Sequence, residues 1–139
     1  MIFTGSPQSL NRVPISKLFL TEAQQLASLH NIQFSNCSVH APYIFNLASV
    51  DDDGYIKNLL VEEIRRTVSM GIRYFIVHPG YAVDNTIEKG IFNIAKNISK
   101  ALDELEDLDF ILCLETMAGK SNQVGGKLED LREIFKLVK

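Results

Sequence analysis

A chain of 139 residues has the length of one ordinary domain, so it can bury a core but has no room for a separate substrate domain. Hydrophobic residues make up 46% of the chain and charged residues 22%, which is typical of a globular protein and excludes a disordered one. The net charge of −3 gives no bulk attraction to a polyanion, so any contact with a nucleic acid must come from local loops and metal ions.

The first residues predict a strand and no targeting signal. The opening segment MIFTGSPQSLNRVP lacks the basic start and the long apolar stretch of a signal peptide, and no run approaches about eighteen apolar residues. We therefore expect a cytoplasmic protein, or a nuclear one in a eukaryote, with no membrane partner. MIFT is expected to end a strand, and Thr21 to cap a helix that reaches His30.

Three later segments are short, rich in strand-forming residues, and end on a side chain that can bind a metal. They are residues 34–40 (FSNCSVH), 74–78 (YFIVH) and 110–115 (FILCLE). Their last residues, His40, His78 and Glu115, lie 38 and 37 positions apart. Since this interval holds one strand, one helix and two loops, the pattern predicts repeated βα units in a parallel sheet.

Helices are expected between these strands. An apolar stripe through Leu59, Ile64 and Val68 predicts a helix that Gly71 ends, and further helices are expected over about residues 85–106 and after residue 127. The order is therefore βαβαβαβα. It suits either a small doubly wound sheet or half of an eight-stranded barrel, and topology alone leaves both open. No GxGxxG or GxxxxGK[ST] motif follows the first strand, so a nucleotide site has no support.

His40, His78 and Glu115 are candidate ligands of one Zn²⁺. Residues at the carboxyl ends of parallel strands project into the crevice where α/β folds bind ligands. Two imidazoles and one carboxylate suit Zn²⁺, with a fourth position open to water or a phosphate oxygen. Each residue alone could be an ordinary hydrogen-bonded or surface side chain. The same placement in three successive units favours a metal site.

Cys37 and Cys113 each lie inside an apolar run. We therefore expect buried, reduced thiols rather than a disulfide or a CxxC metal site.

Longer motifs surround the three strand ends. They are FTGSPQ near the start, SVHAPYIFNLAS around His40, IVHPG around His78 and LETMAGK around Glu115. In this order they resemble the strand-end motifs of the endonuclease IV family of apurinic/apyrimidinic endonucleases, over essentially the whole chain. The resemblance implies an α/β fold of parallel βα repeats, about half of a xylose-isomerase-like (β/α)8 TIM barrel. Residues 1–139 would form a single partial domain that lacks the family's first strand and its C-terminal half.

The resemblance also implies an activity of the intact parent protein, as distinct from this chain alone: zinc-dependent hydrolysis of DNA on the 5′ side of abasic sites during base-excision repair. The intact family holds three Zn²⁺. Here His40 and His78 would hold one of them, and Glu115 would bridge it to a second and so take part in catalysis.

Double-stranded DNA with an abasic site is the implied partner. Tyr43 and Ile44 would enter the DNA where the abasic nucleotide is turned out, and Gln8 and Arg12 would touch phosphates or sugars. The residues alone leave other roles open: Tyr43 could pack over the barrel mouth, and Gln8 and Arg12 could be solvated loop residues.

Two further functions remain open. The first is a sugar isomerase or epimerase of the same barrel superfamily, which also binds divalent metals at strand ends. The second is a non-catalytic metal-binding remnant or assembly fragment. Half a barrel leaves its edge strands unpaired and its inner face uncovered, so we also expect self-association or a partner that supplies the missing C-terminal half.

Overall fold

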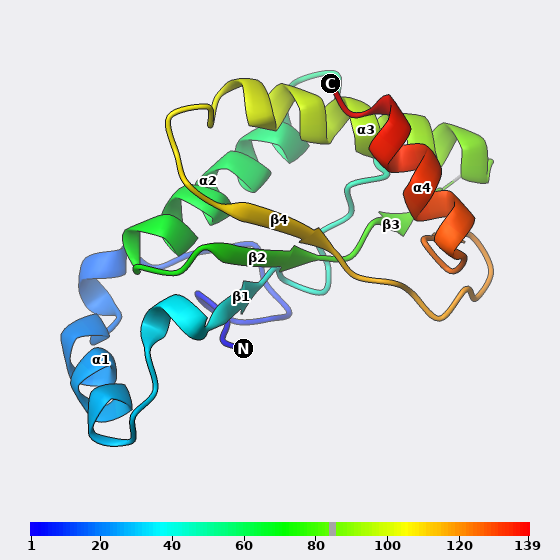
Figure 1. Ribbon diagram of the computed structural model, residues 1–139. Coiled ribbons are helices and arrows are strands. Elements are labelled where there is room, and N and C mark those ends of the chain that lie inside the picture. The colour runs from blue at the N-terminus through cyan, green and yellow to red at the C-terminus, as the bar shows by residue number, and fades with distance from the viewer. Residues whose placement is uncertain (84–85) are drawn as a thin grey trace.

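The computed structural model describes residues 1–83 and 86–139, and a parallel sheet lies at their centre (Figure 1). Its strands are β1 (Ser38–His40), β2 (Tyr74–Val77) and β4 (Ile111–Leu114), in that order across the sheet. Ile2 forms a parallel bridge to Val39, so the first segment joins the sheet beside β1 as an isolated bridge. The sheet therefore follows the order of the chain. A separate antiparallel pair consists of β3 (Gly80–Tyr81) and β5 (Gln123–Val124).

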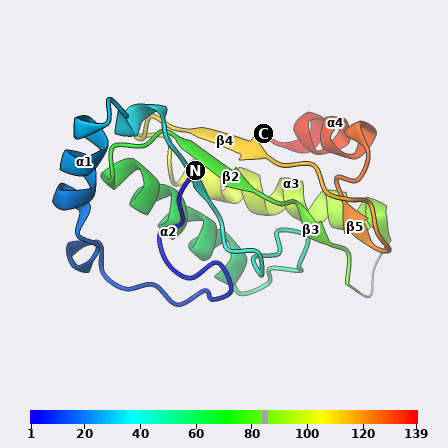
Figure 2. The same ribbon diagram turned by 90° about the horizontal axis from the view of Figure 1, so that it is seen from below.

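Three helices lie on one side of this sheet (Figure 1). α2 (Tyr55–Ser69) packs against β2 and against α3 (Ile87–Asp103), and α3 packs against α4 (Leu128–Leu137). α1 (Leu20–Leu29) has no buried residue, and it lies at the end of the molecule opposite α4 (Figure 2). Two single turns of 3-10 helix complete the elements, Ile15–Lys17 and Phe34–Asn36. Among the helices described, none is both long and apolar enough to cross a membrane.

This topology identifies a section of a barrel. A doubly wound sheet reverses its strand order at a switch point and carries helices on both faces. Here the strands follow chain order and their helices lie on one side, as in successive units of a (β/α)8 barrel. The half-barrel prediction is confirmed.

The elements begin and end close to the predicted residues. Gly71 follows α2 with a φ of 78°, the left-handed conformation that commonly ends a helix. The side chain of Thr21 does not cap α1, because the helix already begins one residue earlier. The predicted start of α3 at residue 85 lies outside the described residues, and the hydroxyl of Thr86 accepts a hydrogen bond from the Lys89 N–H. The predicted strand 34–40 is wrong in its first half, which forms a 3-10 turn.

The two faces of the sheet have different surroundings, because successive side chains of a strand point to opposite faces. Val39, Phe75 and Val77 are fully buried under the helices. On the other face Tyr74 and Ile111 are neighbours in register, and they are 39% and 40% exposed. This second face corresponds to the inside of a barrel and is open here.

Both cysteines are free, as predicted, but the expectation that they are buried is wrong, since each is only half-buried. Cys113 is in register with Ile76 on the open face, and none of the described strands lies opposite it. Cys37 precedes β1 instead of lying within it.

A buried amide joins α3 to the segment after β1. Asn97 is 1% exposed and donates to the carbonyls of Leu47 and Ser49, at 2.9 and 3.1 Å. We expect Asn97→Ala to lower the free energy of unfolding by about 1–3 kcal/mol, because buried carbonyls lose their donor. Denaturant titration measures this change. Asn93→Ala removes one part-buried hydrogen bond to the Ala48 carbonyl, and it should lower the free energy of unfolding by less than half as much. Equal losses of stability in the two variants would contradict the special role given to the buried amide of Asn97.

Candidate metal centre

His40, His78 and Glu115 meet at the carboxyl end of the parallel sheet. His40 is the last residue of β1, and the other two directly follow β2 and β4. Their possible ligand atoms all lie within 4.8 Å of one another. Oε2 of Glu115 is 2.8 Å from Nε2 of His40 and 3.6 Å from Nε2 of His78. The structure thus brings together the three residues that the sequence predicted as ligands.

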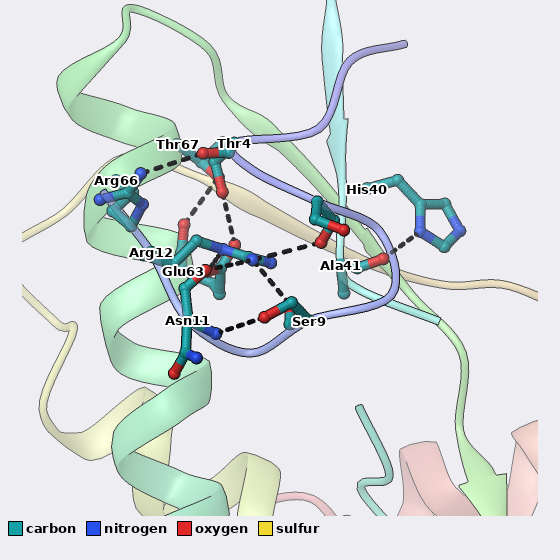
Figure 3. Close-up of polar contacts among 10 residues, drawn as sticks. Thr4, Ser9, Asn11, Arg12, His40, Ala41, Glu63, Arg66 and Thr67 are labelled. Atoms are coloured by element: carbon teal, nitrogen blue, oxygen red, sulfur yellow. Dashed lines mark hydrogen bonds and ion pairs between the residues drawn. The ribbon is translucent and has the colours of Figure 1, made fainter. Parts of the chain in front are cut away.

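The imidazole of His40 is oriented by its own backbone neighbour. Nδ1 of His40 lies 2.6 Å from the carbonyl oxygen of Ala41, and because a carbonyl can only accept, Nδ1 must carry the proton (Figure 3). In the neutral imidazole Nε2 then presents a lone pair toward Glu115. Two acceptors facing each other at 2.8 Å require a proton or a cation between them. A carbonyl that fixes the tautomer of a histidine is also the usual support of a metal ligand.

His78 is suited to the same role. Burial lowers the pKa of His78, the nearby Glu115 carboxylate raises it, and His40 lowers it further, with a net lowering. The neutral imidazole is therefore favoured at neutral pH, and only neutral imidazole binds a metal. Glu115 is 46% exposed, and it lines the same open surface as Tyr74 and Cys113.

Aromatic side chains cover the two histidines. The ring of Tyr43 stacks on His78, with 6.1 Å between centroids and 23° between planes. Phe3 meets His40 at 5.5 Å and Tyr43 at 5.4 Å. Tyr43 nevertheless remains 46% exposed beside His78, and Ile44, the next residue in the chain, is 51% exposed.

Gln8 and Arg12 differ in what they offer to a ligand. Gln8 is exposed in the loop before α1. The side chain of Arg12 is only 3% exposed, and its Nε lies 2.5 Å from a carboxylate oxygen of Glu63 on α2. The contact of Arg12 with DNA stays a prediction, and the observed arrangement favours a supporting role within the loop.

Asn46 joins the loops that follow β1 and β2. Its side chain accepts from the N–H of Tyr81 at 2.8 Å and donates to the Tyr81 carbonyl at 3.0 Å. Gly80 has a φ of 107°, and a Cβ there would lie 1.9 Å from Oδ1 of Asn46. The asparagine of one motif and the glycine of the next are therefore paired by close packing and by the hydrogen bonds to Tyr81, which fixes the loop that follows His78.

Sequence reasoning missed Phe3 and Glu63. Phe3 belongs to the FTGSPQ motif, but no periodicity in the sequence predicts that its ring contacts His40. Glu63 falls among the polar residues of its helix in the sequence, yet its side chain is 6% exposed. Its position, three residues after Leu60 and four before Thr67, lies on the buried stripe of α2, and that spacing was the available signal.

Comparison with known proteins agrees with this geometry. The model of the family described as "Xylose isomerase-like TIM barrel" matches residues 1–139. A "Probable endonuclease 4" from Malacoplasma penetrans is 38% identical over 142 aligned positions, which cover all of this chain and 49% of the relative. Another, from Acholeplasma laidlawii, is 34% identical over 137 residues and is covered to 47%. The chain thus spans about half the length of the curated relatives it matches.

Two solved structures share the fold. A D-tagatose 3-epimerase-like protein superposes with a TM-score of 0.70 and 23% identity, over 96% of this chain and 49% of the other. Endonuclease IV from Thermus thermophilus gives a TM-score of 0.69 and 23% identity, over 95% and 46%. At this identity, the two structures support the barrel alone and do not separate an epimerase from a nuclease.

Proposed function

Because this chain belongs to the endonuclease IV family of xylose isomerase-like TIM barrels, we propose that it supplies part of a zinc-dependent phosphodiester hydrolase acting on abasic DNA. The proposed reaction is cleavage on the 5′ side of the abasic site, within base-excision repair in the cytoplasm or, in a eukaryote, the nucleus. The observation that carries the proposal is the convergence of His40, His78 and Glu115 within 4.8 Å. We propose further that residues 1–139 act as one partial barrel domain.

The three side chains fit a zinc ion by their chemistry. Two imidazole nitrogens and one carboxylate form a common zinc ligand set with a position left open for substrate. His40 is held in the required tautomer by Ala41, and Glu115 lies against both histidines. Zinc, when bound, supplies a Lewis acid that polarises a phosphoryl oxygen and activates water at neutral pH. We propose that Glu115 also reaches a second ion of the family's three, through the side that is open here.

The residues around the ligands suit a damaged nucleotide. Tyr43 stacks on His78, Ile44 follows it in the chain, and both are exposed; we propose that they occupy the space left by an abasic nucleotide turned out of the helix. Gln8, exposed in the neighbouring loop, is proposed to contact sugar or phosphate. Since the chain carries a net charge of −3, these local contacts and the metal must supply the attraction to DNA.

A nicking assay tests the activity. A catalytically active chain, supplied with Zn²⁺, nicks a duplex containing one abasic site on its 5′ side and leaves the matching undamaged duplex intact. A chelator should abolish the nick, and added Zn²⁺ should restore it. Metal binding without any nick would support the non-catalytic alternative instead. Metal-dependent conversion of a ketose, with no effect on DNA, would support the epimerase.

A further inference from the structure

A buried charged cluster ties the loop before α1 to α2 (Figure 3). We call residues 4–12 loop 4–12. The hydroxyl of Thr4, at its beginning, donates to Oε2 of Glu63 at 2.9 Å. Nε of Arg12, at its end, donates to Oε1 of the same carboxylate at 2.5 Å. One glutamate on α2 thus holds both ends of a loop that lies more than fifty residues away in the sequence.

The interior of loop 4–12 is organised around the same guanidinium. Nη1 of Arg12 donates to the carbonyls of Ser6, Ser9 and Asn11, at 3.3, 2.7 and 3.2 Å. Arg66, one turn of α2 from Glu63, donates from Nη2 to the Thr4 carbonyl at 3.1 Å. The loop therefore turns its carbonyls inward toward Arg12, and its shape depends on where Arg12 is held.

Loop 4–12 in turn contacts the candidate metal centre. The carbonyl of Pro7, next to the exposed Gln8, accepts a hydrogen bond of 2.8 Å from the backbone N–H of Tyr43. Tyr43 is the residue whose ring stacks on His78. The contacts thus run from Glu63 to Arg12, from Arg12 to the carbonyl of Ser6, and from Pro7, the next residue in the chain, to Tyr43.

We propose that Glu63 and Arg12 are positioning residues, a clamp that fixes loop 4–12 and, through the Pro7 carbonyl, holds Tyr43 and Gln8 ready for the abasic nucleotide. The inference rests on the proposed function. A role in stability alone explains the cluster less well, because buried ion pairs stabilise little more than apolar residues of the same size. Among the described residues, moreover, Nη2 of Arg12 and Nε of Arg66 are buried without a hydrogen-bond partner. Such unsatisfied donors lower the stability of the fold, whereas the rigid guanidinium of Arg12, with several N–H donors, favours one conformation of loop 4–12.

Amide hydrogen exchange tests the clamp without depending on DNA. In Arg12→Ala we expect exchange of the Tyr43 amide to accelerate by at least about tenfold, because its acceptor on Pro7 is no longer held in place. The Ala41 amide, which donates to the Ile76 carbonyl within the sheet at 2.8 Å, should keep its protection. Since Arg12→Ala leaves the Glu63 carboxylate buried without its charged partner, the double variant Arg12→Met/Glu63→Gln provides a second version with both charges removed. Arg73→Ala, which breaks an ion pair on the exposed surface with Asp109, is the matched control.

The outcomes separate the clamp from the proposed function. Faster exchange at Tyr43 with retained protection at Ala41, in both clamp variants, supports the clamp. Unchanged exchange at Tyr43, or equal acceleration at both amides, overturns the clamp in favour of a general role in stability.

A parallel measurement of DNA binding addresses the proposed function. The ratio of affinities for an abasic and an intact duplex should fall about tenfold in the clamp variants, while their zinc affinity stays within about twofold of that of the unmodified chain. If the unmodified chain shows no such preference, the proposed function is wrong, and the exchange result still decides whether the clamp positions Tyr43.

Discussion

Replacing His40 by alanine is expected to lower the affinity of the chain for Zn²⁺ by at least about 100-fold, a larger loss than supporting residues of a metal site usually cause. His40 is 3% exposed, and its Nε2 lies 2.8 Å from the Glu115 carboxylate. Its removal takes away one of three convergent ligands and leaves only His78 and Glu115. The exposed Glu115 and one half-buried imidazole cannot hold the ion in a fixed geometry.

Competition with a chromogenic zinc chelator measures this loss. The matched control is His30→Ala, because His30 is an exposed histidine at the C-terminal end of α1, on a different element from the three ligands. It should bind zinc as the unmodified chain does. Since Cys37 and Cys113 are free thiols, Cys37→Ser and Cys113→Ser belong in the same series. Zinc binding that survives in His40→Ala but is lost in a cysteine variant would place the ion elsewhere.

The convergence of the three candidate metal ligands was predictable because their positions depend on local rules. A strand that ends on a histidine or glutamate delivers it to the carboxyl edge of a parallel sheet, and successive βα units bring such ends side by side. His40, His78 and Glu115 follow this rule in three adjacent strands. α2 and α3 were equally predictable, since each carries an apolar stripe at helical spacing. A barrel could be distinguished from a doubly wound sheet only once the order of the strands and the side of the helices were known.

The clamp was not predictable from local patterns. Its contacts join residues 59 and 51 positions apart, Thr4 and Arg12 to Glu63, and no periodicity encodes such a pairing. A charged residue on a helix is normally assigned to the solvated face, and Glu63 stands next to Glu62 in a segment that also holds Arg65 and Arg66. The β3–β5 pair is similarly short and depends on tertiary contacts. Elements of one or two residues carry too little sequence pattern to be detected.

The open face of the sheet is expected to drive association of the 139-residue chain when it is purified alone. Tyr74 and Ile111 lie side by side on this face, and both are partly exposed. β4 forms an edge of the three-stranded sheet, so its outer backbone groups have no partner within that sheet. In an eight-stranded barrel, opposing strands would cover the face and a neighbouring strand would pair with the edge. Apolar surface and an unpaired edge together favour contact with another chain.

Charge on the open face should therefore reverse the association. We expect Ile111→Lys to weaken self-association by at least about 100-fold, because each copy loses about 1.5–3 kcal/mol of apolar burial and would have to desolvate an ammonium group. Within one chain the lysine can extend into solvent from a position already 40% exposed, so the fold should persist. Val50→Lys is the control, since Val50 is 60% exposed in a loop away from the sheet. Light scattering over a range of concentrations distinguishes the variants.

Two results would contradict this prediction. If the unmodified chain is monomeric and unfolds cooperatively, the half barrel is stable without a partner. If Ile111→Lys associates as strongly as the unmodified chain, the contact between copies uses another surface, such as the exposed side of α1.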